Sequence, residues 1–105
     1  MNAIRTEQLP QDFQDDIRVV TETLSRYGAN RVILYGSLAR GDAHAASDVD
    51  ICVDGLPSEY FFRALGECLL YSEHSISVID LQNSYGLLRD RILQEGLLLY
   101  ERERV

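Results

Sequence analysis

GSLARGDAHAASDVD, residues 36–50, joins two predicted β-strands and decides how the chain folds around them. An apolar run predicts one strand at residues 31–36, and a second run predicts another at 48–54. Because side chains alternate along a strand, Asp48 and Asp50 must share one face, with their Cα atoms about 6.6 Å apart. The opposite face carries Val49, Ile51 and Val53, which we expect to pack in the core.

The paired carboxylates of Asp48 and Asp50 indicate a cation site. Two like charges held side by side on an apolar strand repel one another, and a hard divalent cation is the usual means of relieving that repulsion. Mg²⁺ is the natural candidate, with both aspartates as its ligands. Cys52 shares their face, but we expect its side chain to pack rather than to ligate.

The first half of the stretch is typical of a phosphate-binding site. Gly36 ends a strand and lets the backbone approach a ligand closely, and the Ser37 hydroxyl lies beside free N–H groups at the start of a short helix predicted at 37–41. Arg40 follows one helical turn later and can add a bidentate phosphate contact. Ser47 flanks the same site, where it can bind the ligand or cap a turn. Together, these residues indicate a site that handles a nucleotide.

The pattern resembles the motif of the polymerase-β-like nucleotidyltransferases, in which Gly-Ser is followed after ten residues by Asp-x-Asp. The short chain and its segments 80–84, 87–89, 92–96 and 99–100 resemble the minimal nucleotidyltransferase group, so that the resemblance covers about residues 30–100. It implies an α/β (α+β) fold with a mixed β-sheet, and transfer of AMP from ATP to a protein hydroxyl. Proteins of this group often act as antitoxins for a HEPN-domain ribonuclease, and their two motif aspartates bind metal.

A third carboxylate usually accompanies this motif, on the third strand, and two registers are open for it. Alignment from the final helix places Ser77 at that position, and alternation agrees, because Ile76, Val78 and Asp80 share a face that its apolar members assign to the core. Alignment from the two motif aspartates instead places Asp80 there. In the first register the site has only two carboxylates, which weakens a second metal ion.

Composition predicts one compact domain over residues 1–105, with an ordered core at about 12–100. The chain has 105 residues, of which 46% are hydrophobic, enough for one core but hardly for two. All ten basic residues are arginines, which excludes a P-loop and a Schiff-base enzyme, since both need lysine. Cys52 and Cys68 lack metal-ligand spacing and are expected to be free and buried.

Charge and hydropathy limit the partners that we expect. The net charge of −7 argues against direct nucleic-acid binding. An acidic surface suits a basic protein partner, and it equally serves solubility alone. No apolar run is long enough to span a membrane, and the N-terminus lacks the apolar core of a signal peptide, so the expected location is the cytoplasm.

The expected element order is α-β-α-β-α-β-α around a mixed sheet. In addition to the elements at 31–36, 37–41 and 48–54, we predict helices at 12–27, from Pro57-Ser58 to about Tyr71, and from a Ser84 cap to Gly96, a strand at 75–80, and a short extended segment at 97–100. Several helical side chains are expected to face the core: Phe61 or Phe62, Leu65, Leu69, Leu88 and Ile92. Residues 1–10 and 101–105 are expected to be loose ends, and His44, His74, Arg63, Arg89 and Arg91 to be solvated.

Three hypotheses follow from these observations. The first is a nucleotidyltransferase in which Asp48 and Asp50 hold Mg²⁺ for catalysis, and Gly36, Ser37 and Arg40 hold the triphosphate of ATP. The resemblance implies that its acceptor is a tyrosine hydroxyl of a HEPN-type toxin. The second is a binding module that keeps the fold but has lost catalysis and neutralises a partner by direct contact. The third is a nucleotide sensor that binds ATP to control a partner. The residue at the third carboxylate position, Ser77 or Asp80, separates the first two.

Overall fold

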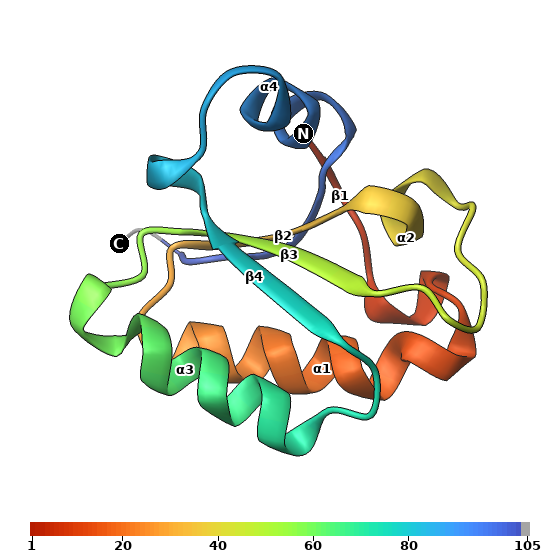
Figure 1. Cartoon of the computed structure of the whole chain (residues 1–105), viewed down its shortest axis with the longest axis horizontal. Coiled ribbons are helices and arrows are strands. Elements are labelled where there is room, and N and C mark those ends of the chain that lie inside the picture. The colour runs from red at the N-terminus through yellow and green to blue at the C-terminus, as the bar shows by residue number, and fades with distance from the viewer. Residues whose placement is uncertain (104–105) are drawn as a thin grey trace.

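The computed structural model describes residues 1–103 and contains one five-stranded sheet with strand order β1-β5-β2-β3-β4 (Figure 1). In chain order the elements are β1 (Asn2–Ala3), the 3-10 helix η1 (Thr6–Gln8), α1 (Gln11–Arg26), β2 (Arg31–Tyr35), α2 (Gly36–Arg40), β3 (Val49–Asp54), α3 (Ser58–Tyr71), β4 (Ile76–Asp80), the 3-10 helix η2 (Leu81–Asn83), α4 (Gly86–Glu95) and β5 (Leu97–Glu101). β2 runs antiparallel to β3 and β5, whereas β4 is parallel to β3 and β1 is parallel to β5. The predicted mixed sheet is confirmed, and so is the α-β-α-β-α-β-α order from α1 to α4, to which the structure adds β1, η1 and η2.

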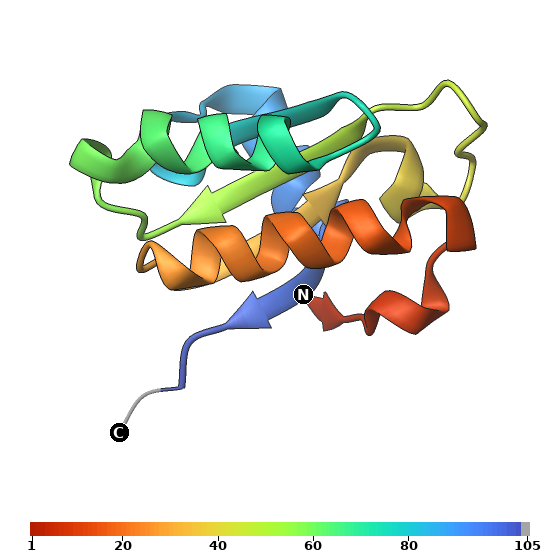
Figure 2. The ribbon, with the colours of Figure 1, turned by 90° about the horizontal axis from the view of Figure 1, so that it is seen from below.

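The sheet separates two apolar layers. α1 and α3 lie side by side on one face, and α4 lies on the other (Figures 1 and 2). Alternation divides the strands accordingly. Val49, Ile51 and Val53 belong to the larger core under α1 and α3, whereas Cys52 packs with Ile33, Leu81 and Ile92 under α4. The face that carries Asp50 is therefore the face that α4 covers.

Helix α1 follows directly from its sequence pattern. Its apolar side chains recur at steps of three and four residues, which aligns them along one face of a helix. Phe13, Ile17, Val20 and Leu24 are all buried at the centre of the larger core. Gly28, at a φ of +104°, turns the chain towards β2 where the helix stops.

The register of β4 confirms the prediction made for Ser77. Ser77 pairs with Asp50, and Asp80 pairs with Val53 at the far end of the strand. The Asp80 carboxylate accepts hydrogen bonds from the Gln82 backbone N–H at 3.0 Å and from the Asn83 side-chain amide at 3.2 Å. Asp80 therefore caps η2 and lies away from Asp50, and the alternative register is wrong.

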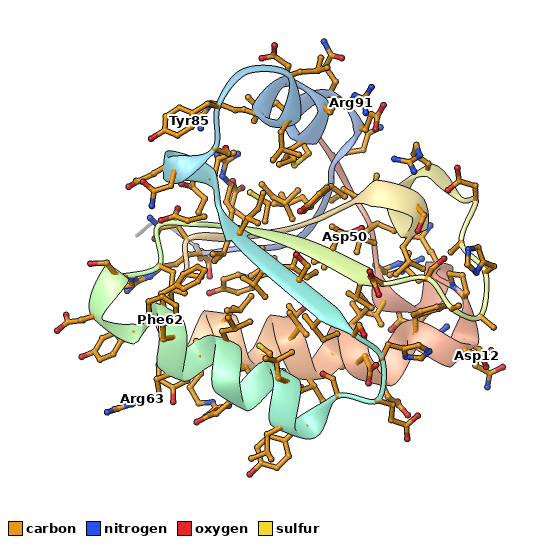
Figure 3. All side chains as sticks on the ribbon, in the orientation of Figure 1. Asp12, Asp50, Phe62, Arg63, Tyr85 and Arg91 are labelled. Carbon is orange, nitrogen blue, oxygen red and sulfur yellow. The ribbon has the colours of Figure 1, made fainter. Side chains whose placement is uncertain are left out.

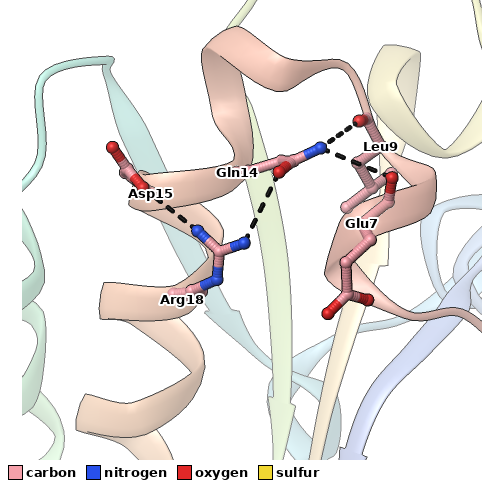
Figure 4. Close-up of polar contacts among 5 residues, drawn as sticks. All are labelled: Glu7, Leu9, Gln14, Asp15 and Arg18. Carbon is pink, nitrogen blue, oxygen red and sulfur yellow. Dashed lines mark hydrogen bonds and ion pairs between the residues drawn. The ribbon is translucent and has the colours of Figure 1, made fainter.

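The N-terminal residues are not a loose end, contrary to prediction. Asn2 and Ala3 pair with β5, and Leu9 is buried against the larger core. Gln14 ties the segment to α1 by donating its side-chain amide to the carbonyls of Leu9, at 2.9 Å, and Glu7, at 3.4 Å (Figure 4). The C-terminal end also differs in part: β5 extends to Glu101 and lies inside the sheet, between β1 and β2, while residues 104 and 105 lie outside the described residues.

The buried face of α3 differs from the predicted one. Ala64 and Cys68 are buried against the core, with Phe61 partly buried beside them, whereas Leu69 is 51% exposed and Phe62 is 81% exposed. Small side chains at positions i and i+4 let α3 approach the sheet and α1 closely. Apolar residues occur all around this helix, so that periodicity alone did not determine its phase.

The region around α4 corrects two further predictions. Ser84 does not cap α4, because its hydroxyl donates to the Leu81 carbonyl at 2.6 Å and closes η2, and α4 begins only at Gly86. Ile92 is buried as predicted, but Leu88 is 46% exposed. Arg89, expected to be solvated, is only partly exposed and donates to the same Leu81 carbonyl.

His74 was predicted to be solvated and is instead held by a buried carboxylate. Asp16 is 4% exposed and accepts hydrogen bonds from the backbone N–H groups of Glu73, at 3.0 Å, and His74, at 2.7 Å. The His74 ring nitrogen Nδ1 lies 2.7 Å from the same carboxylate, and the ring stacks on Phe13. These contacts fasten the turn between α3 and β4 to α1.

Both cysteines are free and buried, as predicted. Burial raises the pKa of the Cys52 thiol to about 12 and that of the Cys68 thiol to about 11, so both remain protonated and pack as apolar groups. Within residues 1–103, no helix has both the length and the apolar character needed to cross a membrane.

Candidate active site

One cavity of about 570 Å³ collects all six residues that the sequence nominates. It lies between α2, the loop from α2 to β3, and α4, on the Asp50 face of the sheet. Its lining consists of Tyr35, Gly36, Ser37, Arg40, Asp42, His44, Ala46, Ser47, Asp48, Asp50, Leu88, Arg91 and Glu95. Residues up to 60 positions apart in the chain, Tyr35 and Glu95, therefore meet in one place.

Asp48 and Asp50 are the two acidic side chains that β3 and the residue before it bring to this cavity. Asp48 immediately precedes β3 and is exposed, whereas Asp50 lies within the strand and is half-buried. Burial raises the pKa of the Asp50 carboxyl, and the neighbouring charge of Asp48 raises it further, while Arg40 opposes both effects. Ionisation of Asp50 is therefore harder than that of a fully exposed aspartate, and a bound cation would favour the ionised form.

Gly36 is required by the position of Asp50. Its φ of +75° lies in the left-handed region, and a Cβ built on it would fall 2.3 Å from Asp50 Oδ2 and 3.1 Å from Asp50 Cγ. No side chain fits in that space. The glycine thus lets the strand turn directly into α2 while the Asp50 carboxylate lies against the turn.

The short helix α2 places Ser37 and Arg40 beside the carboxylates. It ends at Gly41, whose φ of +81° turns the chain into the loop, and the Asp42 backbone N–H closes this end on the Ser37 carbonyl. Arg40 is already engaged by acidic side chains. Its Nε lies 3.4 Å from Asp42 Oδ2, and its Nη1 lies 3.8 Å from Glu95 Oε2 on α4.

Ser47 lines the cavity but uses its hydroxyl to shape the loop. The residue is 8% exposed, and its Oγ accepts a hydrogen bond from the His44 backbone N–H at 2.8 Å. The Ser47 backbone N–H in turn donates to the His44 carbonyl at 2.9 Å. Of the two alternatives raised by the sequence, turn capping is the one that the geometry displays for Ser47.

Three side chains lie in a row across the sheet at the level of Asp50. Strand pairing puts Tyr35 of β2 on one side of Asp50 and Ser77 of β4 on the other. Burial raises the pKa of the Tyr35 phenol, with further increases from Asp50 and Cys52, whereas hydrogen bonding to Ser77 lowers it. Both neighbours of Asp50 therefore offer neutral hydroxyl oxygens in place of a further carboxylate.

The donor set fits one hard cation. Asp48 and Asp50 line the cavity and supply two carboxylates. Ser77 pairs with Asp50 but does not line the cavity, and its hydroxyl is a neutral oxygen of the type that Mg²⁺ accepts. Among residues 1–103 there is no group of three or more histidine, cysteine, aspartate or glutamate side chains arranged to hold a metal. A second cation would have to draw its remaining ligands from a bound ligand and water.

Helix α4 contributes lining residues that sequence reasoning missed. Leu88, Arg91 and Glu95 are spaced by three and four residues, so that they share one helical face, and that face closes the cavity opposite α2. Figure 3 places Arg91 at the side of α4 that lies towards α2. This spacing was visible in the sequence, but nothing in the residues assigned that face to the site before the sheet order was known.

Solved structures with the same fold include toxin–antitoxin proteins. The chain superposes on a toxin–antitoxin crystallised with AMP-PNP with a TM-score of 0.70 and 18% identity over 83% of this chain and 74% of that one. A mutant of the toxin–antitoxin MntA-HpeT gives a TM-score of 0.69 and 16% identity over the same shares of the two chains. A structure described as a minimal nucleotidyltransferase gives 0.61 and 24% identity over 90% of this chain and 95% of that one. At these identities the likeness establishes the fold.

The sequence itself carries the family assignment. No curated protein matches the chain. The family model described as polymerase beta, nucleotidyltransferase, however, matches residues 18–105, which include β2, α2, β3 and every nominated site residue. The chain therefore belongs to the polymerase beta nucleotidyltransferase family.

Proposed function

We propose that this chain transfers AMP from ATP to a hydroxyl group of a partner protein, and that it acts in this way as the antitoxin of a HEPN-type toxin. The observation that carries the proposal is the single cavity in which Gly36, Ser37 and Arg40 face the carboxylates of Asp48 and Asp50. Two proteins with the same fold come from toxin–antitoxin pairs, one of them solved with AMP-PNP.

The residues on the two sides of the cavity would have different roles in the reaction. Ser37 and Arg40 would bind the β- and γ-phosphates and hold them in place as pyrophosphate departs. Asp48 and Asp50 would hold Mg²⁺, which when bound neutralises charge that develops on the phosphates. The acceptor oxygen forms a new bond to the α-phosphorus as the bond between that phosphorus and pyrophosphate breaks, and the proton of the acceptor hydroxyl passes to water.

The direction of attack follows from these positions. In-line displacement requires the acceptor oxygen to enter opposite the leaving pyrophosphate. Since the leaving group lies towards α2, the acceptor comes from the side of Ser77 on β4. β4 is an edge strand of the sheet, so this side is open to a second protein. The −7 charge of the chain favours a basic surface on that protein.

A binding module without catalysis is the second candidate function, and one observation favours it. Ser77 pairs with Asp50 where the family resemblance calls for a carboxylate. A serine there supplies no charge for a second metal ion and no strong base for the acceptor proton. Such a chain would neutralise its partner by contact alone.

Mass spectrometry distinguishes these functions. The chain is incubated with ATP, Mg²⁺ and the proposed partner, a HEPN-type protein, and the partner is examined for a mass increase of one AMP group on tyrosine. Asp48→Asn and Asp50→Asn are the matched inactive variants. Transfer that both variants abolish supports the proposal. A stable complex without transfer supports the binding module, and the absence of both transfer and complex overturns the antitoxin role.

A further inference from the structure

The α4 wall of the cavity carries two charged side chains of opposite sign, Arg91 and Glu95, one helical turn apart. Both are exposed to the cavity and its solvent. Neither follows from the motif at residues 36–50. Because both line the cavity, their charges affect how tightly a highly charged ligand binds there.

Acidic side chains outnumber arginines in the lining of the cavity, and the two arginines differ in their ion-pair partners. Four acidic side chains face it, namely Asp42, Asp48, Asp50 and Glu95, against two arginines, Arg40 and Arg91. Arg40 already lies within ion-pair distance of Asp42 and Glu95. Within residues 1–103, no acidic side chain lies within 4.0 Å of the Arg91 guanidinium. Arg91 is therefore the cation that can meet an incoming anion without first losing a partner.

The bridge between Arg40 and Glu95 spans the cavity from α2 to α4. Its length of 3.8 Å is near the limit for an ion pair, and the two side chains are 46% and 42% exposed. Ion pairs of this kind are weak because water screens them. A triphosphate, with several negative charges, can displace Glu95 and take over the Arg40 guanidinium.

We infer that Arg91 is a phosphate-binding residue of this cavity, specific for nucleoside triphosphates, and that Glu95 competes with the triphosphate for Arg40. The inference rests on the proposed function in that its ligand is the nucleotide of the same site. Arg91 adds attraction for the phosphates from the α4 side. Glu95 reduces that attraction, so removal of the two side chains should change nucleotide affinity in opposite directions.

Binding of ATP, ADP and AMP by isothermal titration calorimetry in the presence of Mg²⁺ tests both roles. Arg91→Gln should weaken ATP binding about tenfold, as expected for loss of a charge-assisted hydrogen bond, and leave AMP binding within about twofold. Glu95→Gln should tighten ATP binding about two- to fivefold, the range of a weak surface ion pair. In an Arg40→Gln background that gain should disappear.

Matched controls come from α3. Arg63→Gln removes another exposed arginine that, among residues 1–103, has no ion-pair partner, and Figure 3 shows its side chain directed away from the cavity. Glu59→Gln removes an exposed acid outside the cavity. Neither should change ATP affinity, and thermal unfolding should show that all four single variants remain folded.

Several outcomes overturn the inference. Arg91→Gln that binds ATP as tightly as the wild type excludes a phosphate contact, and an equal loss for ATP and AMP indicates a structural role. Weaker ATP binding by Glu95→Gln excludes the competition. If the wild type binds ATP and the variants behave as expected, yet no AMP reaches a protein, the proposed transfer fails while the inference stands. A wild type that does not bind ATP overturns both.

Discussion

Replacement of Gly36 by alanine should damage the site far more than it damages the fold. The added Cβ would lie 2.3 Å from Asp50 Oδ2, so the carboxylate must move by roughly 1 Å to restore an ordinary contact. The φ of +75° adds about 1–2 kcal/mol of backbone strain for any residue with a Cβ. Displacement of a catalytic group by 1 Å costs about 100-fold in rate.

Gly41→Ala separates the two effects. Its φ of +81° imposes similar backbone strain, but no atom lies within 4 Å of the position that its Cβ would take. Gly41→Ala should therefore lose about 1–2 kcal/mol of unfolding free energy in urea, and Gly36→Ala should lose more, because the clash with Asp50 adds to the same backbone strain. Only Gly36→Ala should lose, in addition, Mg²⁺-dependent ATP binding and transfer.

The Asp50→Ala background supplies the second comparison. Without the Asp50 carboxylate, most of the clash disappears, and the stability cost of Gly36→Ala should approach that of Gly41→Ala. If Gly36→Ala and Gly41→Ala instead have equal effects on stability and on Mg²⁺-dependent nucleotide binding, the glycine does not serve the position of Asp50 and the reasoning is wrong.

Three further predictions concern the carboxylates and the α1 contact. Asp48→Asn or Asp50→Asn should abolish Mg²⁺-dependent nucleotide binding, and Asp50→Asn should leave the apo chain at least as stable as the wild type in thermal unfolding, because it removes a half-buried charge; marked destabilisation would contradict this. Ser77→Asp should raise the affinity for Mn²⁺ in titration calorimetry, whereas Asp80→Asn should leave it unchanged, and the reverse pattern would refute the assigned register. Asp16→Ala should cost about 2–5 kcal/mol in urea unfolding, because it strands two backbone N–H groups. Burial raises the pKa of Asp16, but hydrogen bonds from those N–H groups and from His74 outweigh burial and lower the pKa below 3.8. The contribution of Asp16 to the free energy of unfolding is therefore present above pH 3.8 and should fall as the pH decreases further. A loss of wild-type stability confined to higher pH would contradict this.

The parts of the fold that the sequence predicted well are those with one unambiguous period. α1 repeats its apolar residues at steps of three and four, and β2 and β3 have short apolar runs between turn signals, so local spacing determined their type and approximate limits. Strand alternation also placed Ser77 beside Asp50 correctly. In each case the determining interaction lies within a few residues along the chain.

Features that depend on distant contacts were not predictable in this way. Asp16 and His74 are 58 residues apart, and the sequence around neither residue predicts that the two side chains pair. In α3, apolar side chains surround the helix, so the choice of Ala64 and Cys68 for the buried face depends on how closely α1 and the sheet approach. Asn2 and Ala3 form a strand only because β5 offers a free edge to them.

The position of α4 could have been predicted from the sequence if the pairing of β5 with β2 had also been predicted. β3 to β4 is a parallel crossover, and α3 covers one face of the sheet as it connects them. β5 is antiparallel to β2 and hence parallel to β4. The connection from β4 to β5 leads back across β3 and β2, which is opposite to the direction of the step from β3 to β4. Because such crossovers are right-handed, α4 must pass over the other face, which is the face of Asp50. Assignment of residues 97–100 to a strand beside β2 would therefore have placed one side of α4 over the cavity.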